Sequence, residues 1–350
     1  MTKRRLSAWV VVALAAFLTI VGCGFGNLAA ATEDTPKPAV ELPPPPQTIT
    51  LAAVGDVMAH MPQVNGAWDP ERQVYDFTPS FKLIESYLSQ PDITIANLET
   101  VIDDSRPYHG YPRFNSPSSL ALALKEAGVD IVTTANNHAL DQDEQGLLNS
   151  LDNLDQIGLM HTGTFRASDE QVPLLTEVQG FNLAFLAYTT TTNGLPVPAG
   201  KEYLVNMWDK EKAAADIKAA RDQGAEFVIT SIHFGPEYQR HPSSDQQEIV
   251  QELIELGADL ILGCHPHVVQ PWAEQIKPGS DQRVLVAYSL GNFISNQYFP
   301  YTDRGIILYV TLAKDPLSGV IDIDSYRVLP TRVLREQRHT VVLDDKLEFP

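Results

Sequence analysis

The sequence has few cysteines, few basic residues and no long apolar run. Only Cys23 and Cys264 are present among 350 residues, which excludes a fold held together by several disulfides. Lys and Arg number 25 against 44 Asp and Glu, for a net charge of −19, which argues against nucleic acid or an anionic lipid surface as a partner. The most apolar stretch, residues 6–21, is shorter than the roughly 20 residues of a membrane-spanning helix.

That apolar stretch has the form of a secretory signal, because three basic residues precede it. It ends in Ile-Val-Gly-Cys at residues 20–23, which resembles a bacterial lipobox. We therefore expect a signal peptide over residues 1–22 and an extracytoplasmic lipoprotein, anchored in the membrane through a lipidated Cys23 at the cell surface or periplasmic face. The alternatives are an uncleaved signal anchor and cleavage near residues 28–31. If Cys23 carries lipid, Cys264 has no disulfide partner, and we expect it to be a small buried residue.

Residues 23–47 are predicted to be a linker rather than a folded segment. The stretch is rich in proline and contains four consecutive prolines at residues 43–46. Such a segment is typical of polyproline II, a semi-rigid spacer. We expect one folded domain over residues 48–350, with its core in 48–300 and further strands within 304–343.

Strand-like apolar runs alternate with helix-like stretches up to residue 262. This alternation predicts an α/β fold with a largely parallel sheet covered by helices. Strands are expected at residues 49–54, 92–96, 130–134, 159–162, 181–188, 227–232 and 259–262, and helices at 79–88, 118–127, 144–157, 208–223 and 246–256. After residue 280, strands expected at 284–289, 305–312, 320–328 and 340–343 have no helices between them. They predict a second, mainly antiparallel sheet.

Residues that bind metals follow five of the expected strands. They are Asp56, Asn97, Glu99, Asn137, His138, His233, His265 and His267. Because the carboxyl ends of parallel strands share one edge of a sheet, these side chains are expected to lie together. A pair of divalent metals needs such a set, with carboxylates to offset charge and neutral imidazoles to complete each shell. In an extended His265-Pro266-His267 segment both imidazoles would face one side and Cys264 the other.

These motifs together resemble the calcineurin-like metallophosphoesterases and, more closely, the CapA family of poly-γ-glutamate capsule synthesis proteins. The matching pieces are Gly-Asp-Val-Met (55–58), Asn-Leu-Glu (97–99), Ala-Asn-Asn-His (135–138), His-Phe-Gly-Pro-Glu-Tyr (233–238), Gly-Cys-His-Pro-His (263–267) and Tyr-Ser-Leu-Gly-Asn-Phe (288–293). The resemblance covers roughly residues 48–300. It implies a four-layer α-β-β-α sandwich of the metallophosphoesterase type, with mixed sheets.

The resemblance also implies a role for each motif residue. Asp56 and His267 would bind a first metal, Asn137, His233 and His265 a second, and Glu99 or Asn97 would take the place of the bridging carboxylate. His138 would stand over the metals as an acid or an anion-stabilising group, at a turn that Asn136 and Asn137 favour. Imidazole and carboxylate ligands indicate one or two Mn, Fe or Zn ions.

The sequence departs from the phosphoesterase pattern in its first motif. That pattern is Asp-x-His, whereas Met58 occupies the histidine position here, and a thioether is a poor ligand for a hard divalent ion. His60 lies two residues further along. Glu237 is either a replacement carboxylate or an exposed loop acid. Asn292 either lines the pocket or fixes the turn at Gly291, and the turn is the preferred reading.

Two functions follow from the resemblance and the ligand set. The first is a cell-surface lipoprotein of capsule or poly-γ-glutamate biosynthesis or export, with the membrane subunits of a capsule synthase as partners. The second is a metal-dependent hydrolase of a phosphoester or of an amide bond in the cell envelope. A third reading is a binding module without chemistry. Because the protein is acidic, a polyanionic polymer would need a metal-charged pocket or a local basic patch.

Overall fold

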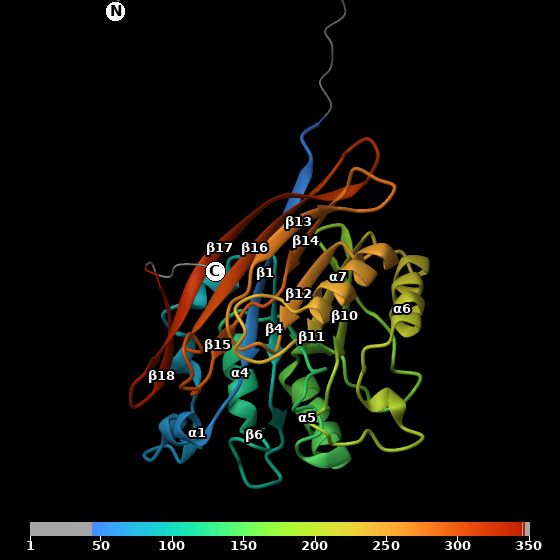
Figure 1. Cartoon of the computed structure of the whole chain (residues 1–350). Coiled ribbons are helices and arrows are strands. Elements are labelled where there is room, and N and C mark those ends of the chain that lie inside the picture. The colour runs from blue at the N-terminus through green and yellow to red at the C-terminus, as the bar shows by residue number, and fades with distance from the viewer. Residues whose placement is uncertain (1–43, 345, 347–350) are drawn as a thin grey trace, which may run out of the picture. The chain divides into compact units, whose positions relative to one another are not determined.

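Strand β1 (Gln47–Val57) lies inside the larger of two sheets. The structure is a computed structural model that describes residues 44–344 and 346, so the expected signal peptide and Cys23 lie outside the described residues. Residues 51–59 are all buried. β1 pairs in parallel with β4 (Ile93–Leu98) and antiparallel with β16 (Arg304–Lys314). The sheet therefore changes from parallel to antiparallel at β1 (Figure 1).

The first sheet has the strand order β18-β17-β16-β1-β4-β7-β8, with β15 paired to the end of β1. Its remaining strands are β7 (Ile131–Thr133), β8 (Met160–Thr162), β15 (Asn292–Ile294), β17 (Ile321–Arg335) and β18 (His339–Leu343). β15 runs parallel to β1 and places Asn292 opposite Asp56. A segment from late in the chain thus meets the carboxyl end of the first strand.

The second sheet has the order β13-β14-β12-β11-β10-β9. Its strands are β9 (Leu174–Val178), β10 (Phe181–Thr189), β11 (Phe227–His233), β12 (Leu260–Cys264), β13 (Trp272–Ile276) and β14 (Arg283–Ala287). The four inner strands are parallel and the two edge strands pair antiparallel. Continuous apolar runs form the inner strands, as expected where both faces of a sheet are covered.

The two sheets pack face to face, and helices cover their outer faces. Leu51 and Ile95 of the first sheet share one apolar core with Phe185, Ile229 and Leu262 of the second. The helices are α1 (Met61–Ala67), α2 (Thr78–Phe81), α3 (Glu85–Ser89), α4 (Ser118–Glu126), α5 (Asp143–Ile157), α6 (Lys210–Asp222) and α7 (Ser244–Leu256). α2, α3 and α4 bury apolar side chains against the first sheet, and α6 and α7 against the second. Of these helices, α4, α6 and α7 are labelled in Figure 1. The predicted α-β-β-α sandwich with mixed sheets is confirmed.

The expected division of the strands between the two sheets is wrong. The strands after residue 280 form no sheet of their own: β14 joins the second sheet beside β12, and β16 to β18 extend the first sheet from β1. The late strands complete the first sheet, because β16 pairs with residues 47–54 of β1 while β4 pairs with β1 on its other side. The helix expected at 79–88 is interrupted, because Ile84 leaves helical geometry at φ −120° and ψ 2°.

Several elements have weak sequence signals. The edge strands β9 and β13 carry no fully buried side chain, so their runs lack the apolar character of inner strands. The remaining short elements are β2 (Trp68–Asp69), β3 (Val74–Tyr75), β5 (Val101–Ile102), β6 (Asn115–Ser116) and a 3₁₀ turn at Glu202–Leu204. Within residues 44–344 no helix has the length and apolar character needed to cross a bilayer.

Candidate metal centre

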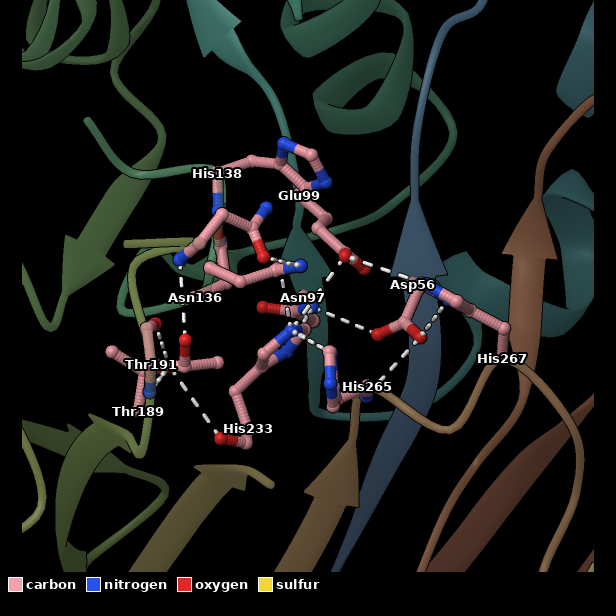
Figure 2. Close-up of polar contacts among 12 residues, drawn as sticks. Asp56, Asn97, Glu99, Asn136, His138, Thr189, Thr191, His233, His265 and His267 are labelled. Atoms are coloured by element: carbon pink, nitrogen blue, oxygen red, sulfur yellow. Dashed lines mark hydrogen bonds and ion pairs between the residues drawn. The ribbon is translucent and has the colours of Figure 1, made fainter. Parts of the chain in front are cut away.

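The expected ligand residues gather where the two sheets present their carboxyl strand ends (Figure 2). Asp56 is the second-last residue of β1 and lies in register with Asn97 of β4. His233 is the last residue of β11, and His265 follows directly after β12. These side chains belong to two sheets, yet all of them are buried. The face-to-face packing of the sheets therefore builds one polar cluster inside an otherwise apolar interior.

Glu99 lies at the middle of this cluster and is fully buried. Neither of its carboxylate oxygens accepts a hydrogen bond from any described residue. Its Oε1 is 3.6 Å from His233 Nε2 and 3.7 Å from His267 Nε2. A buried carboxylate without a hydrogen bond carries a large desolvation cost. Its two oxygens therefore require a partner that the protein side chains do not supply.

Asp56 and His267 form one side of the cluster. His267 Nδ1 lies 3.1 Å from Asp56 Oδ2 and 3.1 Å from the side-chain oxygen of Asn292. Both neighbours are acceptors, so Nδ1 of His267 carries the proton and Nε2 is the nitrogen that faces Glu99. Asn97 donates to the other oxygen of Asp56 at 2.8 Å. These contacts fix the orientation of both side chains.

His233, His265 and Asn137 form the other side. His233 Nε2 is 2.9 Å from Asn137 Oδ1 and 3.0 Å from His265 Nδ1. The amide of Asn97 lies 3.3 Å from His233 Nδ1. Asn97 thus contacts both sides of the cluster through one amide group, while its oxygen accepts from Thr133 at 3.2 Å. Asn97 therefore orients Asp56 and His233 through hydrogen bonds. The carboxylate without hydrogen bonds in this cluster is that of Glu99.

The protonation preferences of the cluster follow from its burial. Burial and the nearby Asp56 carboxylate raise the pKa of Glu99 well above its usual range. Burial and the neighbouring imidazoles lower the pKa of His233 well below its usual value and that of His265 to about 4. Burial alone would raise the pKa of Asp56, but the hydrogen bonds and charge of His267 outweigh it and lower that pKa. At neutral pH His233 and His265 are therefore neutral, the form that binds metals.

The backbone of the His-Pro-His segment differs from the extended conformation expected from sequence. His265 has φ +97° and His267 has φ +59°, both in the left-handed region. Both imidazoles still reach the cluster, but the turns place them there, rather than the alternation of a strand. Cys264 is buried as expected. Burial, and then the charges of Asp56 and Glu99, raise the pKa of its thiol, and the expectation that the thiol points away from the two histidines stays a prediction.

His138 lies in the turn that follows β7, as Asn136 and Asn137 predicted. Its Nδ1 lies 2.6 Å from the buried carboxylate of Asp141. Asn136 holds the turn, because its oxygen accepts from the His138 backbone N–H at 3.1 Å and its amide donates to Leu98 at 2.8 Å. Sequence reasoning missed Asp141. The only signal was an acid three residues after a histidine within a turn.

Two candidates lie at the margin of the cluster. Glu237 is exposed, yet its charge is close enough to contribute to the raised pKa of Glu99. Asn292 is fully buried and contacts His267, so it belongs to the cluster. Its amide also donates to Gln297 and to the Thr302 carbonyl, each at 2.9 Å. Asn292 therefore contacts the cluster and also holds the loop after β15, so its role goes beyond the turn at Gly291.

The first-motif positions differ in their surroundings. Met58 is 1% exposed, and its backbone N–H donates to Ile294 at 3.0 Å. His60 begins α1, and the backbone N–H of Asn296 donates to its Nδ1 at 3.3 Å. His60 belongs to neither of the two groups of potential metal ligands found among the described residues. The first-motif histidine of the phosphoesterase pattern therefore has no replacement from these two side chains.

Comparison with known proteins gives a consistent picture. A family model described as "Bacterial capsule synthesis protein PGA_cap" matches residues 50–297. The capsule biosynthesis protein CapA of Bacillus anthracis is 24% identical over 288 residues, which are 79% of this chain and 67% of that protein. The PGA biosynthesis protein CapA of Bacillus subtilis (strain 168) is 26% identical over 277 residues, covering 73% and 67%.

Among solved structures, a novel phosphatase from Mycoplasma pneumoniae superposes with a TM-score of 0.50. The sequence identity is 14%, and the match covers 81% of this chain and 94% of the phosphatase. At this identity the likeness concerns the fold alone. It agrees with the sandwich of the metallophosphoesterase type that the sequence motifs predicted.

Proposed function

The chain belongs to the bacterial capsule synthesis protein family PGA_cap, and we propose from this premise that it is a cell-surface lipoprotein of capsule or poly-γ-glutamate biosynthesis or export with a metal centre at Glu99. The family match and the metallophosphoesterase-like fold support the proposed role in capsule biosynthesis. The metal centre rests on the geometry of the buried cluster.

The observation that carries the metal centre is the pair of Glu99 oxygens without hydrogen bonds. One ligand atom each of Glu99, His265 and His267 lie within 4.8 Å of one another, and the same holds for Asp56, Glu99 and His233. Glu99 is common to both groups. A divalent cation would offset the desolvation of this carboxylate and would accept the lone pairs of the neutral imidazoles. Nitrogen and carboxylate ligands in this ratio suit Mn, Fe or Zn.

We assign the ligands according to the two sides of the cluster. Asp56 and His267 would hold one ion, Asn137, His233 and His265 the other, and Glu99 would contact both. Asn97 and Asn292 would orient the ligands without binding, since ligand orientation by neighbouring hydrogen bonds is a general feature of metal sites. A bound divalent ion would polarise a phosphoryl or carbonyl oxygen of a substrate.

A hydrolytic activity on a phosphoester or a cell-envelope amide is the second candidate, and the His138–Asp141 pair favours it. Asp141 accepts from Nδ1 of His138 and also from the backbone N–H of Phe114 at 2.5 Å. The carboxylate therefore keeps the proton on Nδ1 and fixes the ring, which leaves Nε2 to exchange a proton with a substrate.

We propose an extracytoplasmic location, with lipid on Cys23 and the proline-rich segment as a spacer that lifts the domain from the membrane. The membrane subunits of a capsule synthase are the proposed partners. Mass spectrometry of the mature protein tests the anchor. A di- or triacylated Cys23 is expected, and an unmodified chain that begins near Ala31 would contradict it.

Metal analysis of the purified full chain tests the centre. The wild-type protein should bind at least one Mn, Fe or Zn ion, and Glu99→Gln should lose most of it because the shared carboxylate is gone. Glu237→Gln is the matched control, since it removes an acid at the edge of the cluster and should retain the metal. Full metal occupancy in Glu99→Gln would show that the ligand assignment is wrong.

A further inference from the structure

A group of exposed and partly buried aromatic and arginine side chains lies beside the buried cluster. We call it the arginine–aromatic platform, and it consists of Tyr238, Arg240, Tyr298, Phe299, Tyr301 and Arg335. Tyr298 is 73% exposed, Phe299 55% and Tyr301 43%. Three large aromatic side chains within four residues at the surface leave a substantial ring area in water, which is typical of a binding surface.

Each arginine of the platform stacks on one of these rings. The Arg240 guanidinium lies 4.4 Å from the centre of the Tyr301 ring, and that of Arg335 lies 4.7 Å from the centre of the Tyr298 ring. The Arg335 guanidinium also donates to the Gln297 carbonyl, and its Nε is buried. The Arg240 side chain has no hydrogen bond or ion pair with another described residue, so its N–H edges remain available. Those edges match the two oxygens of a carboxylate.

Neither platform arginine forms an ion pair with a carboxylate in the described part of the chain. This is notable because acids outnumber basic residues 44 to 25. Other arginines do pair: Arg166 with Asp152, Arg221 with Asp259, and Arg332 with Asp303. Two uncompensated positive charges on one surface of an acidic protein create a local site for an anion.

The platform is connected to the metal-ligand cluster. The Tyr238 ring lies 6.0 Å from the His267 ring and stacks on Phe299 at 4.3 Å between ring centres. The Gln297 side chain accepts from Asn292, and the Gln297 carbonyl accepts from Arg335. A ligand on the platform would therefore lie next to His267 and Asn292 of the buried site.

We propose that the platform binds a polyanion with carboxylates along a polyamide chain and holds it beside the buried cluster. The proposal deepens the proposed capsule function and rests on it for the class of polymer. Arg240 would bind a carboxylate by its two oxygens, and Arg335 would contact another through the N–H groups that Gln297 does not occupy, while the exposed rings pack against the apolar and amide portions of the chain. This local positive charge would offset the electrostatic repulsion between the acidic protein and an anionic polymer.

Glu237 allows a test of whether a negative charge at this surface weakens polymer binding. Its side chain is the hydrogen-bonding partner that, after burial, raises the pKa of Tyr238 above its usual range. It therefore places a negative charge at the edge of the platform. Glu237→Gln should strengthen polymer binding, because a like charge is removed.

The experiment measures the binding of fluorescently labelled poly-γ-glutamate of defined length to the full chain by anisotropy, with and without a chelator. The double variant Arg240→Gln, Arg335→Gln should bind about ten-fold more weakly, as expected for two exposed charge-assisted contacts. Arg327→Gln is the matched control. Its guanidinium also stacks on a tyrosine, with 4.6 Å to the centre of the Tyr309 ring. Tyr309 pairs with Ala52, four residues before Asp56 on β1, and Arg327 does not belong to the platform.

The result separates this proposal from the metal centre. The expected dependence on Arg240 and Arg335 should persist in chelator, even if metal analysis disproves the centre. Unchanged affinity in the double variant, equal loss in Arg327→Gln, or polymer binding that requires metal would overturn the platform. Arg240→Gln alone, expected to weaken binding about three-fold, serves if the double variant misfolds. Equal or tighter binding of labelled polyphosphate would exclude a carboxylate-specific platform.

Discussion

His138 and Asp141 form a buried imidazole–carboxylate pair, with 2.6 Å between Nδ1 and Oδ2, in the turn after the third strand of the parallel run. Both side chains are at most 5% exposed. The pair stands next to the ligand cluster without belonging to either group of potential ligands. This separation predicts that proton transfer and metal binding can be disrupted independently.

His138→Ala should retain metal and fold but lose hydrolytic or capsule-supporting activity. General acid catalysis by one side chain is worth about 10²–10⁴ in rate, so the loss should fall in that range for a hydrolase. Asp141→Asn should reduce activity less and alter its pH profile, because the ring loses its orienting acceptor. Metal analysis and a hydrolysis or capsule assay provide the measurements. Loss of metal in His138→Ala would make His138 a ligand, and full activity would favour a binding module.

Metal binding should release a proton from Glu99. Its pKa is raised well above the usual range, so the free protein holds this carboxyl protonated at a pH where an ordinary glutamate is ionised. A metal requires the carboxylate, so affinity should rise with pH up to the folded-state pKa and then level off. Titration calorimetry with Zn²⁺ in two buffers of different ionisation enthalpy measures the released protons. Glu99→Gln should release fewer, and identical proton counts in both proteins would contradict the role of Glu99.

His339 should make the fold less stable in mild acid. Burial, and then the charge of Arg335, lowers its pKa to about 4. The unfolded chain takes up this proton near pH 6.5. The contribution of neutral His339 to the free energy of unfolding is therefore complete above about pH 6.5 and declines as the pH falls toward about 4. At about pH 5 the loss is about 2 kcal/mol. Urea unfolding at about pH 7 and pH 5 should show a smaller decline for His339→Gln than for wild type. An equal loss of stability in wild type and His339→Gln would show that a group other than His339 takes up the proton.

Gly55→Ala should destabilise the protein and the metal centre together. A Cβ at Gly55 would lie 1.9 Å from the Gly291 carbonyl oxygen, and Asp56 donates its backbone N–H to that same oxygen at 3.0 Å. Overpacking of this kind costs about 1–3 kcal/mol and moves Asp56. Thermal unfolding and metal analysis check both effects. Gly224→Ala is the control, since nothing lies within 4 Å of its Cβ position and only its φ of +92° opposes alanine.

The sequence predicted the fold class and the strand ends because apolar runs of strand length stop at glycine or polar residues. It could not divide the strands between sheets, since β16 and an isolated antiparallel strand have the same local pattern. The partner of β1 is about 250 residues away, and pairing at that distance leaves no local signal. The family resemblance implied the four layers but not the strand order within them.

The sequence predicted the residues of the ligand set by their type. It did not predict the backbone conformations and hydrogen bonds that hold these residues in place. Nothing in His-Pro-His indicates left-handed φ at both histidines, because only the surrounding packing holds them there. Asp141 was missed because its contact with His138 depends on the turn being formed. The roles of Asp56, Glu99, Asn137, His233, His265 and His267 as ligands, like lipidation of Cys23, stay predictions.

The pairing of β1 with β16 also determines the order in which the protein can form. β1 is the first strand of the unit, yet its antiparallel neighbour spans Arg304–Lys314. Contacts between such distant segments must overcome the entropy of closing a very long loop, which slows folding. A growing chain that ends before Arg304 leaves one edge of β1 open, with Asp56 near that edge. A nascent or truncated chain of this kind therefore has an exposed strand edge over residues 47–54 of β1, directly beside the cluster to which Asp56 belongs.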